Sequence, residues 1–132
     1  MHATANGRVL LAGLGPEERD VLLAELLDPG GGLPRLTDRT VTAPDVLRSV
    51  LSEVADRGYA IARDELEIGL TAVAAPIRGV DGTVIASLSA SGPTFRLTDR
   101  LPAVALAVVA AATEVSRRMG FHGSYPTDVN IR

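Results

Sequence analysis

The sequence predicts an α/β domain of the α+β kind, in which helices flank an antiparallel sheet. The strongest observation is a pair of strand-like runs, at 71–78 and 83–91, joined through Asp81 and Gly82, a favoured dipeptide of tight β-hairpins. A second observation is the helical spacing of apolar residues over 44–57 and again beyond residue 98. With 132 residues, the chain is long enough for one domain with a single modest core.

The first predicted helix covers residues 16–27. Pro16 suits the first turn of a helix, and Glu17 and Glu18 complement the positive end of the helix dipole. The glycine-rich segment 28–32 is expected to end this helix. We interpret that segment as a linker loop, because a phosphate-binding loop would follow a strand and open a helix.

The second predicted helix covers residues 44–57 and carries one apolar stripe opposite a polar face. Thr42 is its expected N-cap, with Asp45 completing a capping box. Gly58 is the expected C-terminal cap. Residues 59–62 are then predicted to form a short strand that enters the sheet.

The alternation of residues along the hairpin predicts its two faces. If Asp81 and Gly82 alone form the loop, Val80 pairs with Thr83 and the whole register follows. One face is apolar and suits a core, with Val73, Ala75 and Ile77 opposite Ala90, Leu88 and Ala86. The other face is lined by small residues and three hydroxyl groups, with Ala72 opposite Ser91, Ala74 opposite Ser89 and Pro76 opposite Ser87. Alternation leaves two interpretations of this second face, a solvated outer surface or the floor of a small-ligand pocket.

The last predicted helix begins after a cap at Thr98 or Asp99 and runs to about Met119. Its first half is rich in alanine and valine, which suits packing on a sheet or on another subunit. Gly120 is expected to end the helix. The tail, 121–132, has no periodicity and is expected to be mobile.

The composition excludes several function classes. The absence of cysteine excludes thiol chemistry, thiolate metal sites and disulfides, and a cytoplasmic setting is expected. The net charge of −3 argues against a free-standing nucleic-acid binder. The first residues have no signal-peptide pattern. No membrane association is expected either, because the most apolar stretch, 101–112, is shorter than the ~20 residues that cross a bilayer.

Catalysis is not expected. The two histidines, His2 and His122, lie near the ends of the chain and outside any nucleophile or metal motif. The serines of the hairpin lack the strained Gly-x-Ser-x-Gly turn of a hydrolase nucleophile. The acids Asp64, Glu65 and Glu67 are interpreted as a solvated turn rather than a metal site. The sequence therefore predicts no catalytic residue, no metal and no cofactor.

Five segments, taken in order, resemble the IclR family of bacterial transcriptional regulators. The first, at 2–12, reads His-Ala-Thr-Ala-Asn-Gly-Arg-Val-Leu-Leu-Ala and is similar to the family's His-Ala-Thr-Ala-x-Gly-Lys-Ala-x-Leu-Ala. The others are 34–37 with 39–42, then 57–60, then 65–70 with 74–77, and finally 88–93. Together they reach nearly from the start of the chain to Gly120. The resemblance implies an effector-binding domain of GAF-like fold, which in the family follows an N-terminal winged helix-turn-helix.

The resemblance also implies a ligand. In the family a small organic molecule, often a carboxylate or an aromatic catabolite, occupies a pocket on the sheet and changes the grip of the oligomer on DNA. The positions that match the family's ligand contacts are Ala5, Asn6, Gly7, Ala62, Leu70, Ala72, Ser89 and Ser91. Three of them lie on one face of the predicted hairpin, which favours the pocket over the solvated surface.

Two of these positions depart from the family pattern. The position of Ala62 is acidic in some members, where it can hydrogen-bond the effector, and the position of Ala72 can be polar or larger. Both departures make the pocket roomier and less polar. We therefore expect an effector that is bulkier or more apolar than a two- or three-carbon keto acid, with Asn6 supplying an amide contact.

The resemblance begins at the family's His-Ala-Thr segment. It implies that residues 1–120 form an N-terminally incomplete effector domain, without the winged helix-turn-helix and the first strands, followed by the tail 121–132. Because those strands would leave a sheet edge unpaired, self-association as a homodimer or tetramer is expected. DNA would be bound only through the absent domain. The alternatives are an oligomerisation module with a vestigial pocket and, third, an enzyme.

Overall fold

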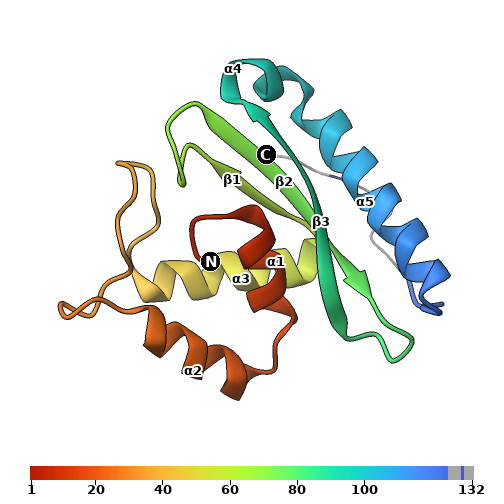
Figure 1. The fold of residues 1–132 in the computed structure, drawn as a ribbon, viewed down its shortest axis with the longest axis horizontal. Coiled ribbons are helices and arrows are strands. Elements are labelled where there is room, and N and C mark those ends of the chain that lie inside the picture. The colour runs from red at the N-terminus through yellow and green to blue at the C-terminus, as the bar shows by residue number, and fades with distance from the viewer. Residues whose placement is uncertain (125–128, 130–132) are drawn as a thin grey trace.

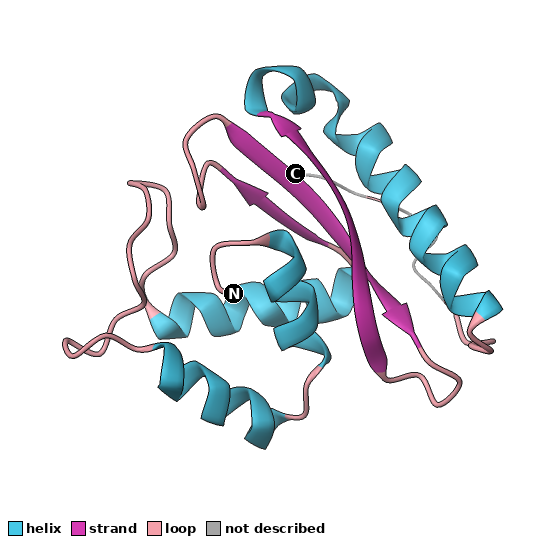
Figure 2. Ribbon diagram, in the orientation of Figure 1, coloured by secondary structure: helices cyan, strands magenta, loops and turns pink. Residues whose placement is uncertain are grey.

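The computed structural model of the chain describes residues 1–124 and 129. Its sheet has three antiparallel strands in the order β1-β2-β3, and helices lie on both sides of it (Figures 1 and 2). The predicted fold class is therefore confirmed. The elements, in chain order, are α1 (Ala5–Gly13), α2 (Pro16–Leu26), α3 (Pro44–Arg57), β1 (Ala60–Arg63), β2 (Leu70–Arg78), β3 (Val84–Pro93), α4 (Thr94–Leu97), the 3-10 turn η1 (Thr98–Arg100) and α5 (Leu101–Arg118).

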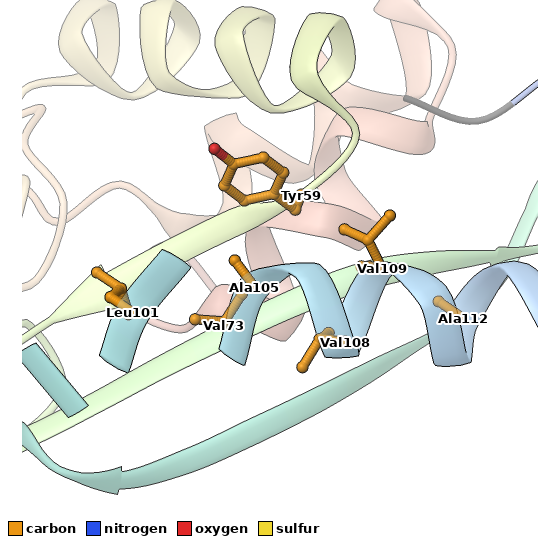
Figure 3. Close-up of a cluster of buried hydrophobic side chains, with 8 residues drawn as sticks. Tyr59, Val73, Leu101, Ala105, Val108, Val109 and Ala112 are labelled. Atoms are coloured by element: carbon orange, nitrogen blue, oxygen red, sulfur yellow. The ribbon is translucent and has the colours of Figure 1, made fainter. Parts of the chain in front are cut away.

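The face of the hairpin that was predicted to be apolar packs against α5. Val73 and Ala75 of β2 are fully buried there, and Ile77, Leu88 and Ala90 are packed beside them. Because α5 lies along the sheet, its apolar stripe covers this face from end to end (Figure 3). The stripe consists of Leu101, Ala105, Val108, Val109 and Ala112.

The opposite face of the sheet is covered by α1 and α3. Ala60 and Ala74 are fully buried there, against Ala5 and Val9 of α1 and Val54 of α3. The small side chains of the strands let α1 approach closely. The interpretation of this face as a solvated surface is therefore wrong for β1 and the middle of β2, whereas Ser89 and Ser91 of β3 are exposed. Further from the sheet, a leucine cluster holds α1, α2 and α3 together, and it consists of Leu11, Leu23, Leu33, Leu47 and Leu51.

The register of the hairpin is confirmed, but its loop is not. The backbone N–H of Gly79 donates to the carbonyl oxygen of Thr83 at 2.9 Å, so the loop has three residues, 80–82, and not two. Gly82 lies in the left-handed region at φ +84°, as the last residue of a three-residue loop requires. The carboxylate of Asp81 accepts hydrogen bonds from the amide and hydroxyl of Thr83, which stabilises this loop. The predicted pairing of Val80 with Thr83 is therefore wrong.

A β-bulge at Ile85 restores the predicted register. The pairs jump from Arg78–Val84 to Ile77–Ala86, which leaves Ile85 as the extra residue of β3. From there to the pair of Ala72 with Ser91, every predicted pair is present. The extra residue in the loop and the extra residue in the bulge cancel, so the faces of the sheet are those that alternation predicts.

The ends of α3 are confirmed, but its predicted N-cap is not. Ala43 occupies the N-cap position without a side-chain hydrogen bond, and Pro44 begins the helix. The predicted capping box of Thr42 and Asp45 is therefore wrong. Pro44 has its φ fixed at a helical value, so it begins the helix without help from a capping side chain. At the other end, Gly58 is in the left-handed conformation at φ +80°, as predicted.

The last helix begins later than predicted. Thr98 and Asp99 lie in η1, and α5 begins at Leu101 with no side-chain cap. Pro102 lies in the first turn of α5, where its missing N–H leaves no hydrogen bond unmade. At the C-terminus, Gly120 has φ +93°, and the amide of Phe121 donates to the carbonyl oxygen of Ser116 at 2.9 Å. This is a Schellman cap, which confirms the predicted end at Gly120.

Two segments complete the comparison with the sequence. The sequence predicts no helix at the segment of α1. In the structure this helix is capped by Thr4, which accepts a hydrogen bond from the amide of Gly7 at 3.0 Å. Of the tail, residues 125–128 and 130–132 lie outside the described residues, and Val129 packs against the α5 cluster. None of the helices within the described residues is long and apolar enough to cross a membrane.

A buried ion pair fixes α1 to the end of β1. The guanidinium of Arg8 makes two hydrogen bonds to the carboxylate of Glu65, at 2.6 and 2.5 Å, and both residues are more than nine-tenths buried. Arg8 Nε donates to the carbonyl oxygen of His2, and Nη1 also donates to that of Ile61. The amide of Val41 donates to Glu65 Oε1. The pair therefore joins the N-terminal turn, the 33–41 loop and the sheet.

We predict that Glu65→Gln lowers the free energy of unfolding by about 3 kcal/mol, because it leaves a buried guanidinium without its countercharge. The matched control is Glu114→Gln, which breaks the Arg118–Glu114 pair, whose side chains are 78% and 55% exposed. That variant should lose no more than about 0.5 kcal/mol, as exposed pairs do. Urea unfolding at neutral pH measures both. Equal losses in the two variants would contradict a structural role for the buried pair.

A second prediction concerns Gly13, where α1 crosses the start of β3. A Cβ added there would lie 2.6 Å from Cβ and Cγ2 of Val84. Gly13→Ala should therefore lower the free energy of unfolding by about 1–3 kcal/mol, as overpacking does. Because the double variant Gly13→Ala/Val84→Gly removes both obstructing atoms, Cβ and Cγ2 of Val84, it should be more stable than the sum of the two single losses predicts. Strict additivity in urea unfolding would show that the contact is not tight.

Candidate functional site

The floor of the candidate site is formed by two rows of small residues that cross the sheet. In the first row Ala62 of β1 pairs with Ala72 of β2, which pairs with Ser91 of β3. In the second row Ala60 pairs with Ala74, which pairs with Ser89. Because alternate residues of a strand point to the same face, both rows lie on the face that α1 covers. Leu70 lies on this face too, one step beyond the first row.

The amide side chain of Asn6 joins α1 to this floor. Asn6 Nδ2 donates to Ser89 Oγ at 3.0 Å, and Ser87 Oγ donates to Asn6 Oδ1 at 2.7 Å. The first turn of α1 therefore lies over β3, as the cap at Thr4 and the close approach at Gly7 allow. At Gly7 a Cβ would fall 2.1 Å from the carbonyl oxygen of Met1. The sequence placed Ser87 on this face but did not identify it as a partner of Asn6.

The eight predicted residues differ in burial, from buried through half-buried to exposed. Ala5 and Ala62 are only 1% and 5% exposed, and they pack in the same cluster between α1 and the sheet. Asn6, Ser89 and Ser91 are exposed. The remaining three are Gly7, which is buried, and Leu70 and Ala72, which are half-buried. The structure thus brings the predicted residues together but opens only one side of their arrangement to solvent.

The exposed side offers neutral polar groups. Asn6 has an amide donor and acceptor, and Ser89 and Ser91 have hydroxyls that donate or accept. Within residues 1–124 and 129, the hydroxyl of Ser91 has no hydrogen-bond partner. The N-terminus of α1, at Ala5, adds the positive end of a helix dipole. Such a set suits a ligand with a carboxylate or a hydroxyl group beside an apolar body.

The turn between β1 and β2 closes one end of the site. Asp64 has φ +57°, and its Oδ1 accepts hydrogen bonds from the hydroxyl of Thr94 at 2.7 Å and the amide of Gly69 at 2.8 Å. These two hydrogen bonds, that of Thr94 first, hold the pKa of Asp64 below its usual value. The hydroxyls of Thr71 and Thr94 also meet at 2.9 Å. The turn is thereby attached to the start of α4.

The acidic segment 64–67 is not a uniformly solvated turn. Glu65 is buried against Arg8, so the interpretation of this residue as solvated is wrong. Glu65 can be buried because its countercharge, Arg8, lies 57 residues away in the sequence and contacts it only in the folded chain. Glu67 is exposed, as predicted. Among the described residues, no group of three or more acidic or histidine side chains is arranged to hold a metal ion.

The chain matches a known protein family over most of its length. Residues 1–117 match the family described as bacterial transcriptional regulator IclR, C-terminal. The chain is 39% identical to the HTH-type transcriptional regulator BhcR of Paracoccus denitrificans, over 88% of this chain and 40% of that protein. It is 37% identical to the HTH-type transcriptional regulator KdgR of Escherichia coli, over 96% of this chain and 46% of that protein.

Solved structures agree with the sequence matches. The C-terminal domain of E. coli KdgR superposes with a TM-score of 0.80 at 36% identity, covering 91% of this chain and 71% of that one. The inducer-binding domain of PobR from Acinetobacter, in complex with 3-hydroxybenzoic acid, superposes with a TM-score of 0.73 at 29% identity, covering 87% of this chain and 64% of that one.

The matched proteins are transcriptional regulators and not enzymes, in agreement with the sequence prediction. The chain spans about two-fifths to a half of the length of these curated relatives. The chain belongs to the IclR family of bacterial transcriptional regulators and corresponds to their C-terminal domain.

Proposed function

We propose that this chain binds a small organic effector, a carboxylate or an aromatic catabolite, on the face of the sheet beneath the first turn of α1. The observation that carries the proposal is the group of exposed polar side chains, Asn6, Ser89 and Ser91, beside a floor of alanines. Few convergent polar groups next to an apolar surface are typical of small-molecule sites. DNA binding is assigned to the part of the related regulators that this chain does not match.

The hydrogen bonds of Asn6 suggest how such an effector is recognised. A carboxylate beside β3 accepts hydrogen bonds from the hydroxyls of Ser89 and Ser91, and replaces Ser89 as the acceptor of Asn6 Nδ2. Because Asn6 belongs to α1, this exchange moves or anchors the first turn of the helix. Binding is thereby coupled to the position of α1. In this proposal, α1 is the element through which an effector changes the affinity of the whole regulator for DNA.

The alanines favour an effector with an apolar body. Ala62 and Ala72 add neither charge nor hydrogen-bonding side chains to the floor. A short, fully polar keto acid would therefore form no favourable polar contact with them. The relative PobR supports an aromatic acid, since its inducer-binding domain is described with 3-hydroxybenzoic acid. Asp64, whose carboxylate is already held by Thr94 and Gly69, is not part of the proposed contact.

We predict that 3-hydroxybenzoate binds more tightly than glyoxylate or pyruvate in isothermal titration calorimetry. Ser89→Ala and Ser91→Ala should each weaken its binding by about tenfold, because each removes one hydrogen bond to a charged group. Ser52→Ala, which changes an exposed serine on α3, is the matched control and should leave binding unchanged. Tighter binding of glyoxylate or pyruvate than of the aromatic acid would refute the proposed effector class.

We also propose that the chain self-associates, as a homodimer or tetramer, through the free edge of β3. Thr94 N–H donates to the carbonyl oxygen of Gly69, and by the alternation of antiparallel pairs the backbone groups of 87, 89 and 91 point away from β2. Within the described residues no strand pairs with that edge. A ten-residue edge without a charged side chain is a ready template for another strand.

Light scattering at several protein concentrations tests this assembly. We predict a dimer or a larger species, and Ile85→Lys should shift it towards monomer because a lysine on an edge strand opposes pairing. The control is Val46→Lys on α3, since Val46 is 51% exposed and Ile85 is 50% exposed. A monomer at every concentration would contradict the proposed assembly.

An oligomerisation module with a vestigial pocket is the second candidate function. The close packing of Ala5 against the sheet favours it, because part of the family's ligand surface is filled by the chain itself. Thermal unfolding with a panel of organic acids separates the two candidates. A ligand that binds the folded state alone raises the melting temperature, whereas a vestigial pocket leaves it unchanged with every acid of the panel.

A further inference from the structure

A hollow lies on the same side of the sheet as the candidate effector site, at the other end of α1. Its volume is about 250 Å³, and it is enclosed by the second half of α1, the end of α3 and the hairpin end of β2 and β3. The walls are aliphatic, from Val9, Ala12, Val54, Pro76 and Val84. None of the eight residues assigned to the effector site lines this hollow.

One charged residue, Arg78, is among the lining residues. Its Nη1 donates to the carbonyl oxygen of Gly82 at 2.9 Å, and its backbone amide donates to Ser116 Oγ. No carboxylate within the described residues lies close enough to form an ion pair with it. The nearby Asp81 is already occupied by the amide and hydroxyl of Thr83. Arg78 therefore keeps further N–H donors available in a hollow whose other side chains are aliphatic.

The guanidinium of Arg78 is half-buried among aliphatic side chains and has no countercharge among residues 1–124 and 129, so it is matched by an anion with an aliphatic body. Arginine presents its donors in a planar fork that fits the two oxygens of a carboxylate. The volume equals about eight times the ~30 Å³ that a water molecule occupies in the liquid, so the ligand must be short. We infer that this hollow is a second ligand site, which takes a short-chain aliphatic monocarboxylate with its carboxylate on Arg78 and its chain between α1 and α3.

The site would act on the same helix as the effector site. Val9 and Ala12 follow Asn6 along α1, and Val84 lies on the same strand as Ser89. A ligand in the hollow would therefore contact the second half of the helix whose first turn lies over the effector site. The inference does not depend on effector binding, because the two sites share no residue.

Methyl and amide NMR of the whole chain, titrated with sodium pentanoate, tests the inference. At about 10 mM a site with a Kd of ~1 mM is nearly saturated. We expect the methyl signals of Val9, Val54 and Val84 to shift with pentanoate and not with pentanamide, which has the same shape and no charge. Absence of these shifts at saturation, or equal shifts with pentanamide, would overturn the inference.

Variants separate the hollow from the effector site. Arg78→Gln should weaken pentanoate binding about tenfold, because it removes the charged hydrogen-bond donor. Arg78→Lys, which keeps the charge, should bind pentanoate with an affinity between those of the unchanged chain and the Gln variant. Ala55→Leu, on α3, fills the hollow without altering Arg78 and should also weaken binding. Because Ala55→Leu keeps the hydrogen bond from Arg78 to Gly82, weaker binding in this variant cannot result from a destabilised hairpin. Ser89→Ala should leave pentanoate binding unchanged, and loss of binding in that variant alone would place the anion in the effector site instead.

Discussion

The arrangement of the domain depends on the buried pair of Arg8 and Glu65. Two charges removed from water are tolerated only when each finds a partner, and here the guanidinium also reaches the carbonyl oxygens of His2 and Ile61. These contacts fix both the position and the rotation of α1 over the sheet. Since Asn6 precedes Arg8 by two residues, its amide is thereby held against Ser87 and Ser89 of β3. The same pair thus stabilises the fold and positions the candidate site.

The effector binding that we propose requires an element whose position depends on the ligand. The second half of α1 is held by packing, with Leu11 and Val9 buried, whereas its first turn combines the packing of Ala5 with the polar contacts of Asn6. Polar contacts exchange with a polar ligand far more readily than a packed core rearranges. The contacts of Asn6 are therefore the part of the α1–sheet interface that a polar ligand would exchange with first.

The fold class and the floor of the site could be predicted from the sequence because both follow from local alternation. A period of two places Ser89 and Ser91 on one face of β3, and Ala72 shares that face because the bulge at Ile85 offsets the extra residue of the loop. What escaped prediction is not local. Glu65 has no neighbour in the sequence that shows its partner to be Arg8, and the segment of α1 has a weak helical pattern that is interrupted by Gly7 and closed by Gly13. The cap at Ala43 and the turn η1 escaped because proline at a helix start makes side-chain caps dispensable.

The bulge at Ile85 has a consequence for how this domain can change during evolution. It absorbs one residue between the hairpin tip and the serines of β3, so the extra residue of the loop does not shift the floor beneath α1. An insertion or deletion of one residue in the 80–82 loop can be compensated by gain or loss of the bulge, with Ser87, Ser89 and Ser91 left facing the same way. Tip length and ligand preference can therefore diverge independently among related chains.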